Sequence, residues 1–252
     1  MERNIDISAT IVLYKEDVIT LQKTIASFLK TPLSKRLYIV DNSPTDVLQE
    51  FCNFPEVEYV FTGKNSGFGS AHNSVLNKIN KRSKYHLILN PDVTFESEVL
   101  LKLIQELADN NDVAIISPKV VYPEGKIQYT CRKYPTFFEL IYRRFGIFKE
   151  FTQKQEYRNE DLNQSFYPDF FQGCFLLFNT LDFVAINGFD ERYFLYMEDV
   201  DICKKIDVLG KRKRYFPDVQ ITHKHRRGSS QKIILLYYHI SSAIKYFKKW
   251  KN

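Results

Sequence analysis

The chain has 252 residues, 44% of them hydrophobic and 26% charged, which is the balance of a globular protein with one sizeable core. No apolar run approaches the ~20 residues that a membrane-spanning helix needs, and the polar residues 1–6 are not expected to be a signal peptide. The four cysteines have no CxxC spacing, which argues against a structural zinc site and favours free thiols over a disulfide framework.

Strands and helices alternate through the first 118 residues. Buried-strand patterns at 7–13, 37–40, 57–61, 85–89 and 113–116 are separated by helical spacing at 18–29, 70–79 and 99–108. This alternation predicts an α/β fold with a mostly parallel, doubly wound central sheet. Ligands of such sheets bind at the carboxyl ends of the strands, which is where Asp41 and Asp92 are expected.

The alternation ends after residue 118. A strand is expected at 175–178, a helix from the acidic cluster at Glu198 to a stop at Gly210, and a short strand at 218–221. Residues 231–250 have the spacing of one amphipathic helix, with an apolar stripe made of Ile233, Leu236, Tyr237, Ile240, Ile244 and Phe247. This helix could dock on the core or lie on a membrane surface, and the sequence leaves both open.

Charge is distributed unevenly along the chain. Residues 202–252 contain 14 Lys and Arg against 2 Asp and Glu, whereas residues 1–201 contain 22 against 28. The basic C-terminal part is expected to attract anions such as lipid headgroups, phosphates or nucleic acid.

Two common nucleotide-binding motifs are missing. The first glycine of the chain is Gly63, so the first strand is not followed by the glycine-rich turn that binds NAD or FAD. The chain also lacks the GxxxxGK[ST] motif of a P-loop kinase. A nucleotide must therefore be bound in another way.

Two segments could bind a nucleotide. Asp41 can accept a hydrogen bond from the imide N–H of uracil or thymine, or it can begin a turn with Asn42. The loop 64–73 combines two glycines with two asparagines ahead of a helix, so backbone N–H groups could approach a ligand closely. From this loop we assign Asn65, Gly67, Phe68 and Asn73 to the nucleotide-sugar site, although a tight strand-to-helix turn would explain the glycines alone.

A metal site is predicted after the fourth strand. Asn90 and Asp92 follow an apolar run, and a carboxylate there can hold Mg²⁺ or Mn²⁺ together with phosphate oxygens, or simply cap the next helix. His223 is the candidate for a second metal ligand, and Arg226 beyond it could bind diphosphate oxygens.

The second acidic cluster, residues 198–201, is the candidate catalytic site. Three acids in four residues repel each other, which raises the proton affinity of at least one of them and suits a general base. We choose Asp199 as the base, with Glu198 and Asp201 as alternatives; a favourable interaction with the helix dipole would also explain the cluster.

These motifs, taken in order over residues 7–230, resemble family 2 inverting glycosyltransferases of the GT-A fold, in particular the bacterial rhamnosyltransferase-like branch. The matching segments are Val40 to Ser43, Asn65 to Gly69, Leu89 to Val93, Asp169 to Gly173, Gly188 to Glu191, Phe194 to Asp201, and His223 with Ser229 and Ser230. Two departures are Asn90 in place of the first carboxylate of an Asp-x-Asp motif and Lys204-Lys205 where the family usually has an arginine.

The resemblance implies a role for each matching residue. Tyr14, Asp41, Asn42 and Asn90 would contact the nucleotide sugar, while Asp92 and His223 would bind Mg²⁺ or Mn²⁺. An acceptor site would contain Phe171, Gln172, Gly173 and Glu198. An acceptor hydroxyl deprotonated by Asp199 would attack the anomeric carbon and invert its configuration.

The resemblance also suggests an arrangement of the chain and its partners. Residues 1–230 would form the GT-A domain, with a nucleotide-sugar half at 1–118 and an acceptor-binding, catalytic half at 119–230; residues 231–252 would form a basic amphipathic helix. The donor would be dTDP-rhamnose, with UDP-galactofuranose, a UDP-hexose or UDP-HexNAc as alternatives. The acceptor would be a lipid-linked saccharide of a cell-surface polysaccharide.

The expected location is cytoplasmic, peripheral to the inner face of the plasma membrane, where the C-terminal helix would meet an anionic surface. A homodimer is compatible with the sequence. No nucleic acid is expected as a partner, although an anion- or nucleic-acid-binding module without catalysis is the alternative from another class of protein.

Overall fold

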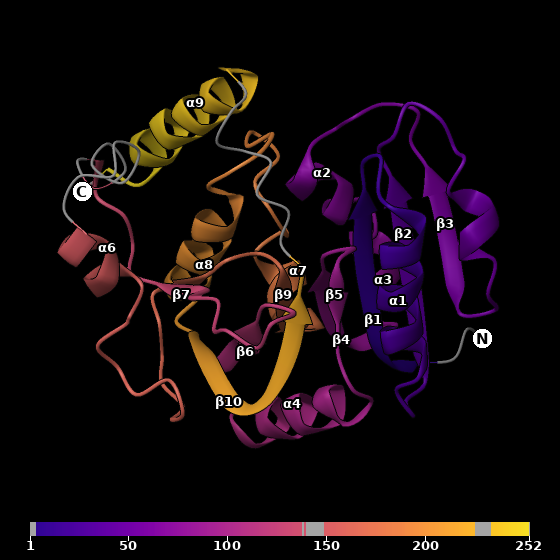
Figure 1. Cartoon of the computed structure of the whole chain (residues 1–252), viewed down its shortest axis with the longest axis horizontal. Coiled ribbons are helices and arrows are strands. Elements are labelled where there is room, and N and C mark those ends of the chain that lie inside the picture. The colour runs from indigo at the N-terminus through magenta and orange to yellow at the C-terminus, as the bar shows by residue number, and fades with distance from the viewer. Residues whose placement is uncertain (1–3, 138, 140–148, 225–232, 252) are drawn as a thin grey trace.

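The computed structural model describes residues 4–137, 139, 149–224 and 233–251. An eight-stranded sheet in the order β3-β2-β1-β4-β9-β6-β10-β5 runs through the centre of the molecule (Figure 1). Its strands are β1 (Ile5–Leu13), β2 (Lys35–Asp41), β3 (Val57–Phe61), β4 (Ser83–Leu89), β5 (Val93–Thr94), β6 (Val113–Val121), β9 (Phe175–Asn179) and β10 (Arg212–His223). A small second sheet pairs β7 (Cys131–Arg132) with β8 (Phe170–Phe171).

The central sheet is mostly parallel, as the sequence predicted. β1 pairs in parallel with β2 and β4, β2 with β3, and β6 with β10. β9 lies between β4 and β6 and is antiparallel to both, so β4 and β6 point in the same direction. Only β9 and β5 run against the other strands of this sheet. The carboxyl ends of β1, β2 and β4 therefore meet at one edge.

Helices cover both faces of the sheet, which confirms the doubly wound fold. One core cluster packs α1 (Val18–Leu29) and α4 (Glu98–Asp109) against one face. The other packs α2 (Phe68–Asn73), α3 (Leu76–Ile79), α7 (Thr180–Ala185), α8 (Glu198–Val208) and α9 (Ile233–Lys249) against the opposite face. Neighbouring residues of one strand, such as Leu87 and Ile88, belong to opposite clusters, because side chains alternate along a strand. The described residues also form the 3₁₀ helix η1 (Gln49–Cys52) and α6 (Lys149–Gln155).

Local sequence explains why α1 forms where it was expected. Asp17 is the N-cap, and its side chain accepts a hydrogen bond from the Thr20 backbone N–H at 3.0 Å. Leu21, Ile25 and Phe28 follow at helical spacing and are 0–1% exposed. The cap and the stripe together fix the start and the buried face of the helix.

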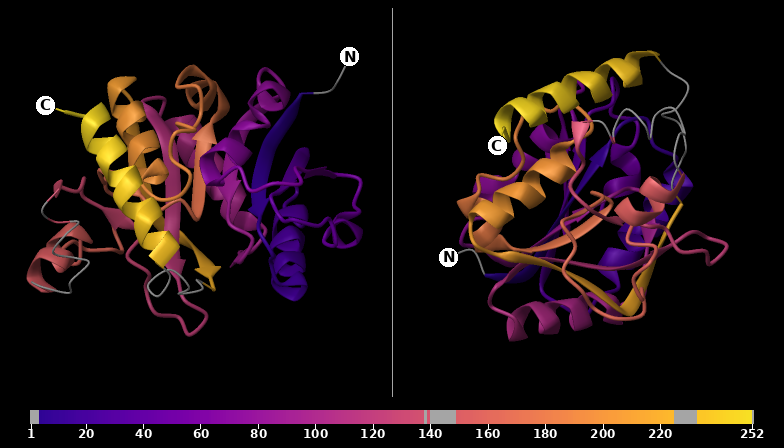
Figure 2. Two further views of the ribbon diagram at one scale, coloured as in Figure 1. Left: turned by 90° about the horizontal axis from the view of Figure 1, so that it is seen from above. Right: turned by 90° about the vertical axis from the view of Figure 1, so that its left-hand side faces the viewer.

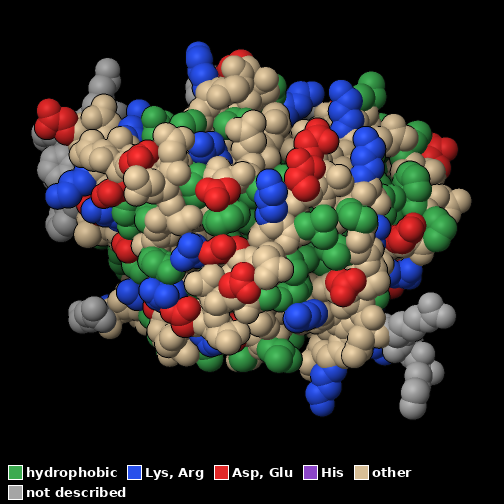
Figure 3. Space-filling model, turned by 90° about the horizontal axis from the view of Figure 1, so that it is seen from below, with side chains coloured by type: hydrophobic (Ala, Val, Ile, Leu, Met, Phe, Trp, Pro, Cys, Tyr) green, Lys and Arg blue, Asp and Glu red, His purple; other side chains and the backbone are tan. Residues whose placement is uncertain are grey.

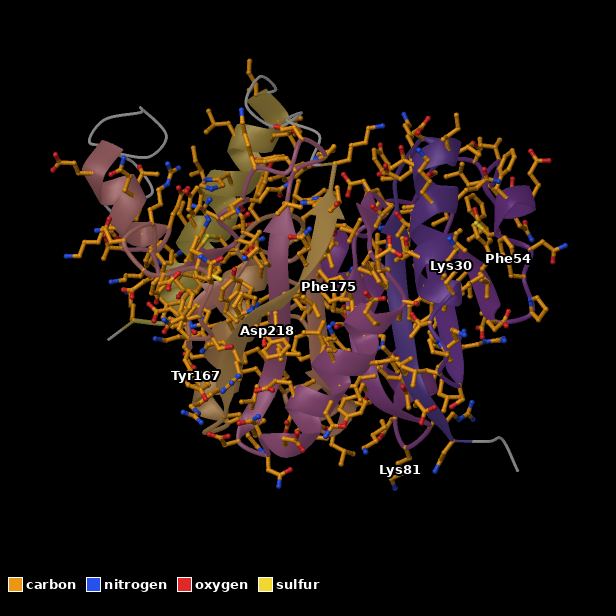
Figure 4. All side chains as sticks on the ribbon, turned by 60° about the horizontal axis from the view of Figure 1, so that its bottom comes forward. Lys30, Phe54, Lys81, Tyr167, Phe175 and Asp218 are labelled. Carbon is orange, nitrogen blue, oxygen red and sulfur yellow. The ribbon has the colours of Figure 1, made fainter. Side chains whose placement is uncertain are left out.

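Two expected elements have different boundaries. The helix expected at 70–79 is two short helices, because Ser74 N–H donates to Ala71 O and closes the first helix with a tight turn. The strand expected at 218–221 is the end of β10, which continues past a register shift between Phe216 and Gln220. Pro217 lies inside this shift and has no N–H for the ladder. Figure 4 labels Asp218 on β10 and Phe175 in the central part of the sheet.

The C-terminal helix α9 lies on the outside of α8 (Figures 1 and 2). Within the described residues, no helix is both long and apolar enough to cross a membrane. The boundary expected at 230 and 231 lies outside the described residues.

Candidate active site

Asp92 and His223 lie together because β5 and β10 pair. The antiparallel register places His223 opposite Val93, the residue that follows Asp92. The Asp92 Oδ1 atom is 3.2 Å from His223 Nε2, and both side chains are largely buried. The two residues that the sequence predicted as metal ligands are thus neighbours, although 131 positions separate them in the chain.

Gln128 orients the His223 ring. Its Oε1 accepts from His223 Nδ1 at 2.9 Å, and its Nε2 donates to the His223 backbone oxygen at 2.6 Å. A proton on Nδ1 leaves Nε2 to face Asp92, so the Gln128 amide fixes which nitrogen is available to a ligand. Gln128 could not be found from the sequence, since no motif marks a residue that acts through a histidine far along the chain.

The surroundings of His223 favour its protonated form. Burial alone would lower the pKa of the imidazole, but the neighbouring Cys174 sulfur and the Asp92 carboxylate raise the pKa of His223 to about 10. Its side chain also hydrogen-bonds with the Cys174 side chain. Among the described residues, no group of three or more His, Cys, Asp or Glu side chains could hold a metal ion. In this described part of the chain, the candidate metal ligands are the Asp92 carboxylate and the His223 imidazole.

Glu198 and Asp199 begin helix α8 next to a glycine. A Cβ built on Gly173 would lie 3.6 Å from Asp199 Cβ and 3.7 Å from the Phe68 ring. The Asp199 carboxylate accepts hydrogen bonds from the backbone N–H groups of Val200, at 2.9 Å, and Gly173. Three segments that the sequence assigned to the site, around Phe68, Gly173 and Asp199, thus meet in space.

Both acids at the start of α8 hold protons more tightly than usual. Burial and then the Asp199 charge raise the pKa of Glu198. Burial also raises the pKa of Asp199, against the lowering effects of the Val200 N–H and the Arg132 charge. Glu198 is 7% exposed and its Oε2 has no hydrogen-bond partner among the residues that the structure describes, whereas Asp199 is partly exposed. Asp199 is therefore the acid that a substrate can reach more easily.

Two consecutive residues join the metal-ligand pair to the acids. The Gly173 N–H donates a hydrogen bond to the Asp199 carboxylate. The side chain of the next residue, Cys174, hydrogen-bonds with the His223 imidazole. The turn is held by Gln172 N–H, which donates to Thr130 O at 2.9 Å. The two acidic clusters of the sequence are therefore parts of one site.

Asp201 has a structural role, which corrects its choice as an alternative base. It is 0% exposed, and its carboxylate accepts from Lys249 Nζ at 2.8 Å and from Trp250 Nε1 at 2.7 Å. Tyr193 OH also donates to it, at 3.3 Å. This acid fastens helix α9 to the core and has no exposed surface to offer an acceptor.

The glycines of the 64–73 loop serve chain packing. Gly67 has φ +88°, and a Cβ there would lie 2.5 Å from Phe194 O; at Gly69 it would lie 2.8 Å from Phe189 Cβ. Phe68 N–H donates to Phe194 O at 3.2 Å. The close approach expected towards a ligand is therefore an approach between α2 and the segment before α8.

Asn73 belongs to the same packing, and its side-chain amide bonds to the protein backbone. Its Oδ1 accepts from Phe189 N–H and its Nδ2 donates to Phe189 O, both at 2.8 Å. Gly188 has φ +54°, and a Cβ there would overlap Asn73 Oδ1 at 2.2 Å. Asn73 was predicted to bind the nucleotide sugar, but in the structure its amide instead connects α2 to Gly188 and Phe189.

Asn42 and Asn65 organise the loop above β2. Asn42 is 1% exposed; its Nδ2 donates to Gly67 O at 3.2 Å and to Asn65 Oδ1 at 3.4 Å. Asn65 Oδ1 also accepts from Gly67 N–H at 3.0 Å. Asn65 is exposed and could still meet a ligand, whereas Asn42 is occupied inside the loop.

Asp41 also has internal partners at the end of β2. Tyr59 OH donates to its Oδ2 at 2.5 Å, and Ser43 N–H donates to its Oδ1 at 2.7 Å. Asp41 is 0% exposed, so in this structure its carboxylate has no surface open to a nucleobase. Tyr14, at the end of the adjacent β1, is 48% exposed and offers a ring face at this edge.

The remaining predicted residues divide into three groups. Phe171 is 0% exposed and belongs to the core, which corrects its place in the acceptor site, while Gln172 and Gly173 are partly exposed. Asn90 is partly exposed, and its N–H donates to Cys174 O at 2.9 Å. Arg226 lies outside the described residues.

The two lysines that replace the expected arginine have their own contacts. Lys204 Nζ lies 4.5 Å from the centre of the Tyr134 ring, and Lys205 Nζ donates to Gly188 O at 2.5 Å. Both serve packing around α8.

Comparison with known proteins gives a family match over most of the chain. Residues 8–177 match the family model described as glycosyl transferase family 2. The rhamnosyltransferase WbbL of Escherichia coli (strain K12) is 26% identical over 224 residues, which cover 85% of this chain and 82% of that protein. An N-acetylglucosaminyl-diphospho-decaprenol L-rhamnosyltransferase of Mycobacterium tuberculosis (strain CDC 1551 / Oshkosh) is 26% identical over 89% of this chain and 78% of its own.

Solved structures show the same fold. GalNAc-T7, crystallised with UDP, GalNAc and Mn²⁺, superposes with a TM-score of 0.68 at 15% identity. The match covers 89% of this chain but only 44% of that one. At this identity the likeness establishes the GT-A fold alone.

Proposed function

The chain belongs to glycosyl transferase family 2 and is a glycosyltransferase, and we propose that it is an inverting, metal-dependent enzyme whose base is Asp199. One observation carries this proposal: Gly173 contacts Asp199 while Cys174 contacts His223, so the general base and the metal-ligand pair flank one turn. A single displacement needs both at once, a base for the acceptor hydroxyl and a positive charge beside the leaving diphosphate.

Asp92 and His223 fit a divalent cation such as Mn²⁺ or Mg²⁺. The carboxylate and imidazole lie 3.2 Å apart, and Gln128 leaves Nε2 of His223 facing Asp92. Ions of this kind are commonly held by one or two protein ligands with phosphates and water completing the shell. When bound, the ion neutralises negative charge that develops on the diphosphate leaving group.

Asp199 supplies the proton acceptor. Its raised pKa improves it as a base for a hydroxyl, and the N–H groups of Val200 and Gly173 hold the carboxylate in place. Glu198 keeps its proton longer, which limits the repulsion that a second charge would bring to the site. Gln172 and Gly173 form the wall where an acceptor sugar would lie.

The donor we propose is dTDP-rhamnose, because two relatives over more than four fifths of the chain are rhamnosyltransferases by name. A UDP-sugar is the alternative, since the related fold of GalNAc-T7 holds UDP. The exposed ring of Tyr14 and the Asn65 side chain are the proposed donor contacts at the strand edge.

The acceptor we propose is a lipid-linked saccharide. The name of the mycobacterial relative specifies a diphospho-decaprenol acceptor, and residues 202–252 carry a strong basic excess. Action on such a lipid places the protein at the inner face of the plasma membrane, in cell-surface polysaccharide synthesis.

A donor screen tests this function. Purified protein would be given dTDP-rhamnose, UDP-sugars and GDP-sugars, with Mn²⁺ or with EDTA, and both sugar-nucleotide hydrolysis and thermal stabilisation would be measured. We expect one donor to respond only with metal, and Asp92→Ala to abolish that response. A folded protein that responds to no nucleotide sugar would overturn the proposal.

A further inference from the structure

Helix α9 has one face on the core and an apolar face that the described residues leave uncovered. Ser242, Ala243 and Tyr246 are 2–7% exposed and pack inward. On the other side an apolar ridge follows the helix at spacings of three and four residues; it consists of Ile233, Ile234, Tyr237, Ile240 and Ile244, which are 44–88% exposed. The apolar stripe predicted from the sequence therefore does not lie on one face: Phe247 packs against the core, whereas the ridge residues are exposed.

The inner face of α9 holds the segment that carries the catalytic acids. Ser242 Oγ donates to Leu195 O at 2.9 Å, and Lys245 Nζ donates to Arg192 O at 2.6 Å. The Tyr238 ring lies 4.6 Å from the Phe194 ring, measured between centroids. Together with Lys249 and Trp250 on Asp201, these contacts make α9 and residues 192–201 one packed unit.

The charge of this helix points to an anionic surface. Residues 231–252 contain five lysines and no aspartate or glutamate. Lys248 is exposed on the ridge side, one turn after Ile244. Two copies of the chain placed ridge to ridge would bring like charges together without a carboxylate on either helix, whereas anionic headgroups would neutralise them.

The opposite side of the molecule is different. Figure 3 shows that face, where acidic and basic side chains are interspersed among small apolar areas. Over the described surface as a whole, Ile19, Leu181 and Val208 are also 65–73% exposed, but each lies on a separate helix, α1, α7 and α8. Exposed residues of that kind are ordinary, while a row on one helix with lysines beside it is the pattern of an interfacial helix.

We propose that the ridge Ile233, Ile234, Tyr237, Ile240 and Ile244 docks in the plane of an anionic lipid bilayer and thereby fixes the catalytic segment 192–201 at the membrane surface. The helix has 17 residues and lies along the core, so it enters the interface sideways. The inference that docking brings the catalytic segment close to a lipid-linked acceptor rests on the proposed function. The docking of the ridge on a bilayer does not.

Vesicle binding tests the docking without any sugar. The full chain would be sedimented with vesicles of phosphatidylglycerol and phosphatidylcholine, or of phosphatidylcholine alone. The ridge variant Tyr237→Ser/Ile240→Ser/Ile244→Ser would be compared with a matched control, Ile19→Ser/Leu181→Ser/Val208→Ser. We expect the ridge variant to bind anionic vesicles at least about tenfold more weakly than wild type, and the control to bind like wild type.

Two further measurements separate the possible outcomes. Trp250, the single tryptophan, contacts Asp201, so unchanged tryptophan fluorescence would show that α9 still docks on the core in the ridge variant. Equal vesicle binding by the ridge variant and wild type, or no binding by wild type, would overturn the proposal. The proposal would also be overturned if light scattering showed that wild type is a dimer and the ridge variant a monomer, because the ridge would then pack against a second copy of the chain.

Turnover links the docking to the active site. With a lipid-linked acceptor in vesicles, the ridge variant should lose activity in proportion to its lost binding, while a soluble short-chain acceptor should be used equally well by both proteins. If neither acceptor is used by wild type, the proposed function fails, and the vesicle-binding result still stands.

Discussion

The two acidic sites of the protein differ in what balances their charge. Asp92 lies 3.2 Å from the His223 imidazole, whose pKa is raised, so a metal ion bound there would have to displace a proton from this pair. Glu198 and Asp199 have mainly backbone N–H groups and the more distant Arg132, and burial raises the pKa of both. We therefore expect the carboxylates to serve a cation at one place and a proton at the other, because their neighbours differ.

The largest effect should come from Asp199→Asn. The amide keeps the shape of the side chain but cannot take the acceptor proton, so kcat should fall about a thousandfold with little change in the KM for the donor. Steady-state kinetics measure both values. A loss below about tenfold would remove Asp199 as the base and leave Glu198 as the candidate.

Asp201→Ala should affect folding more than chemistry. It leaves Trp250 without its buried partner and Lys249 with Asp190 as its remaining carboxylate partner, and the free energy of unfolding should fall by about 2 kcal/mol. Urea unfolding measures this loss, and a red shift in the fluorescence of Trp250 reports release of the helix end. Full stability in this variant would contradict the structural role given to Asp201.

Gln128→Ala should weaken the cation site without touching a ligand. Loss of the amide that orients His223 is expected to lower Mn²⁺ affinity by about 10–100-fold. Titration of Mn²⁺ by electron paramagnetic resonance, in the presence of dTDP or UDP, measures this directly. The control is Gln105→Ala, because Gln105 bonds only to Asp109 on the exposed face of α4 among the contacts described. Equal affinities in the two variants would refute the positioning role.

Glu198→Gln should change how stability depends on pH. The pKa of Glu198 is higher in the folded than in the unfolded chain, so its favourable contribution is complete below its ordinary pKa and is lost as pH rises towards the raised value. Wild type should therefore lose on the order of 1 kcal/mol more than Glu198→Gln between about pH 5 and pH 8. Urea unfolding at both pH values measures this difference. An equal loss of stability in wild type and in Glu198→Gln would contradict the raised pKa of Glu198.

Much of the fold and part of the site could be predicted from local pattern. Helix α1 and strand β3 have the predicted boundaries, since a side-chain cap, apolar spacing and β-branched or aromatic residues decide them locally. Asp92 and His223, chosen from the sequence as two ligands of one metal, lie side by side because β5 pairs antiparallel with β10, and their metal binding stays a prediction.

Roles that depend on distant neighbours could not be predicted in the same way. Asn73 and Asp201 are the residue types that bind ligands, yet Phe189, Lys249 and Trp250 occupy them. Gln128 carries no motif, and its importance arises only where β10 brings His223 beside it. The glycines at 67 and 69 gave the right signal, a close approach, but the approaching group is the chain itself.

The sequence by itself determined the order of strands and helices, the amphipathic C-terminal helix and the two acidic clusters, because each depends on residues close together in the chain. Only the tertiary structure decided which acid of the second cluster is partly exposed, which is fastened to α9, and which side of that helix remains exposed. Those properties are set by burial and by partners from other segments, and a local pattern contains neither.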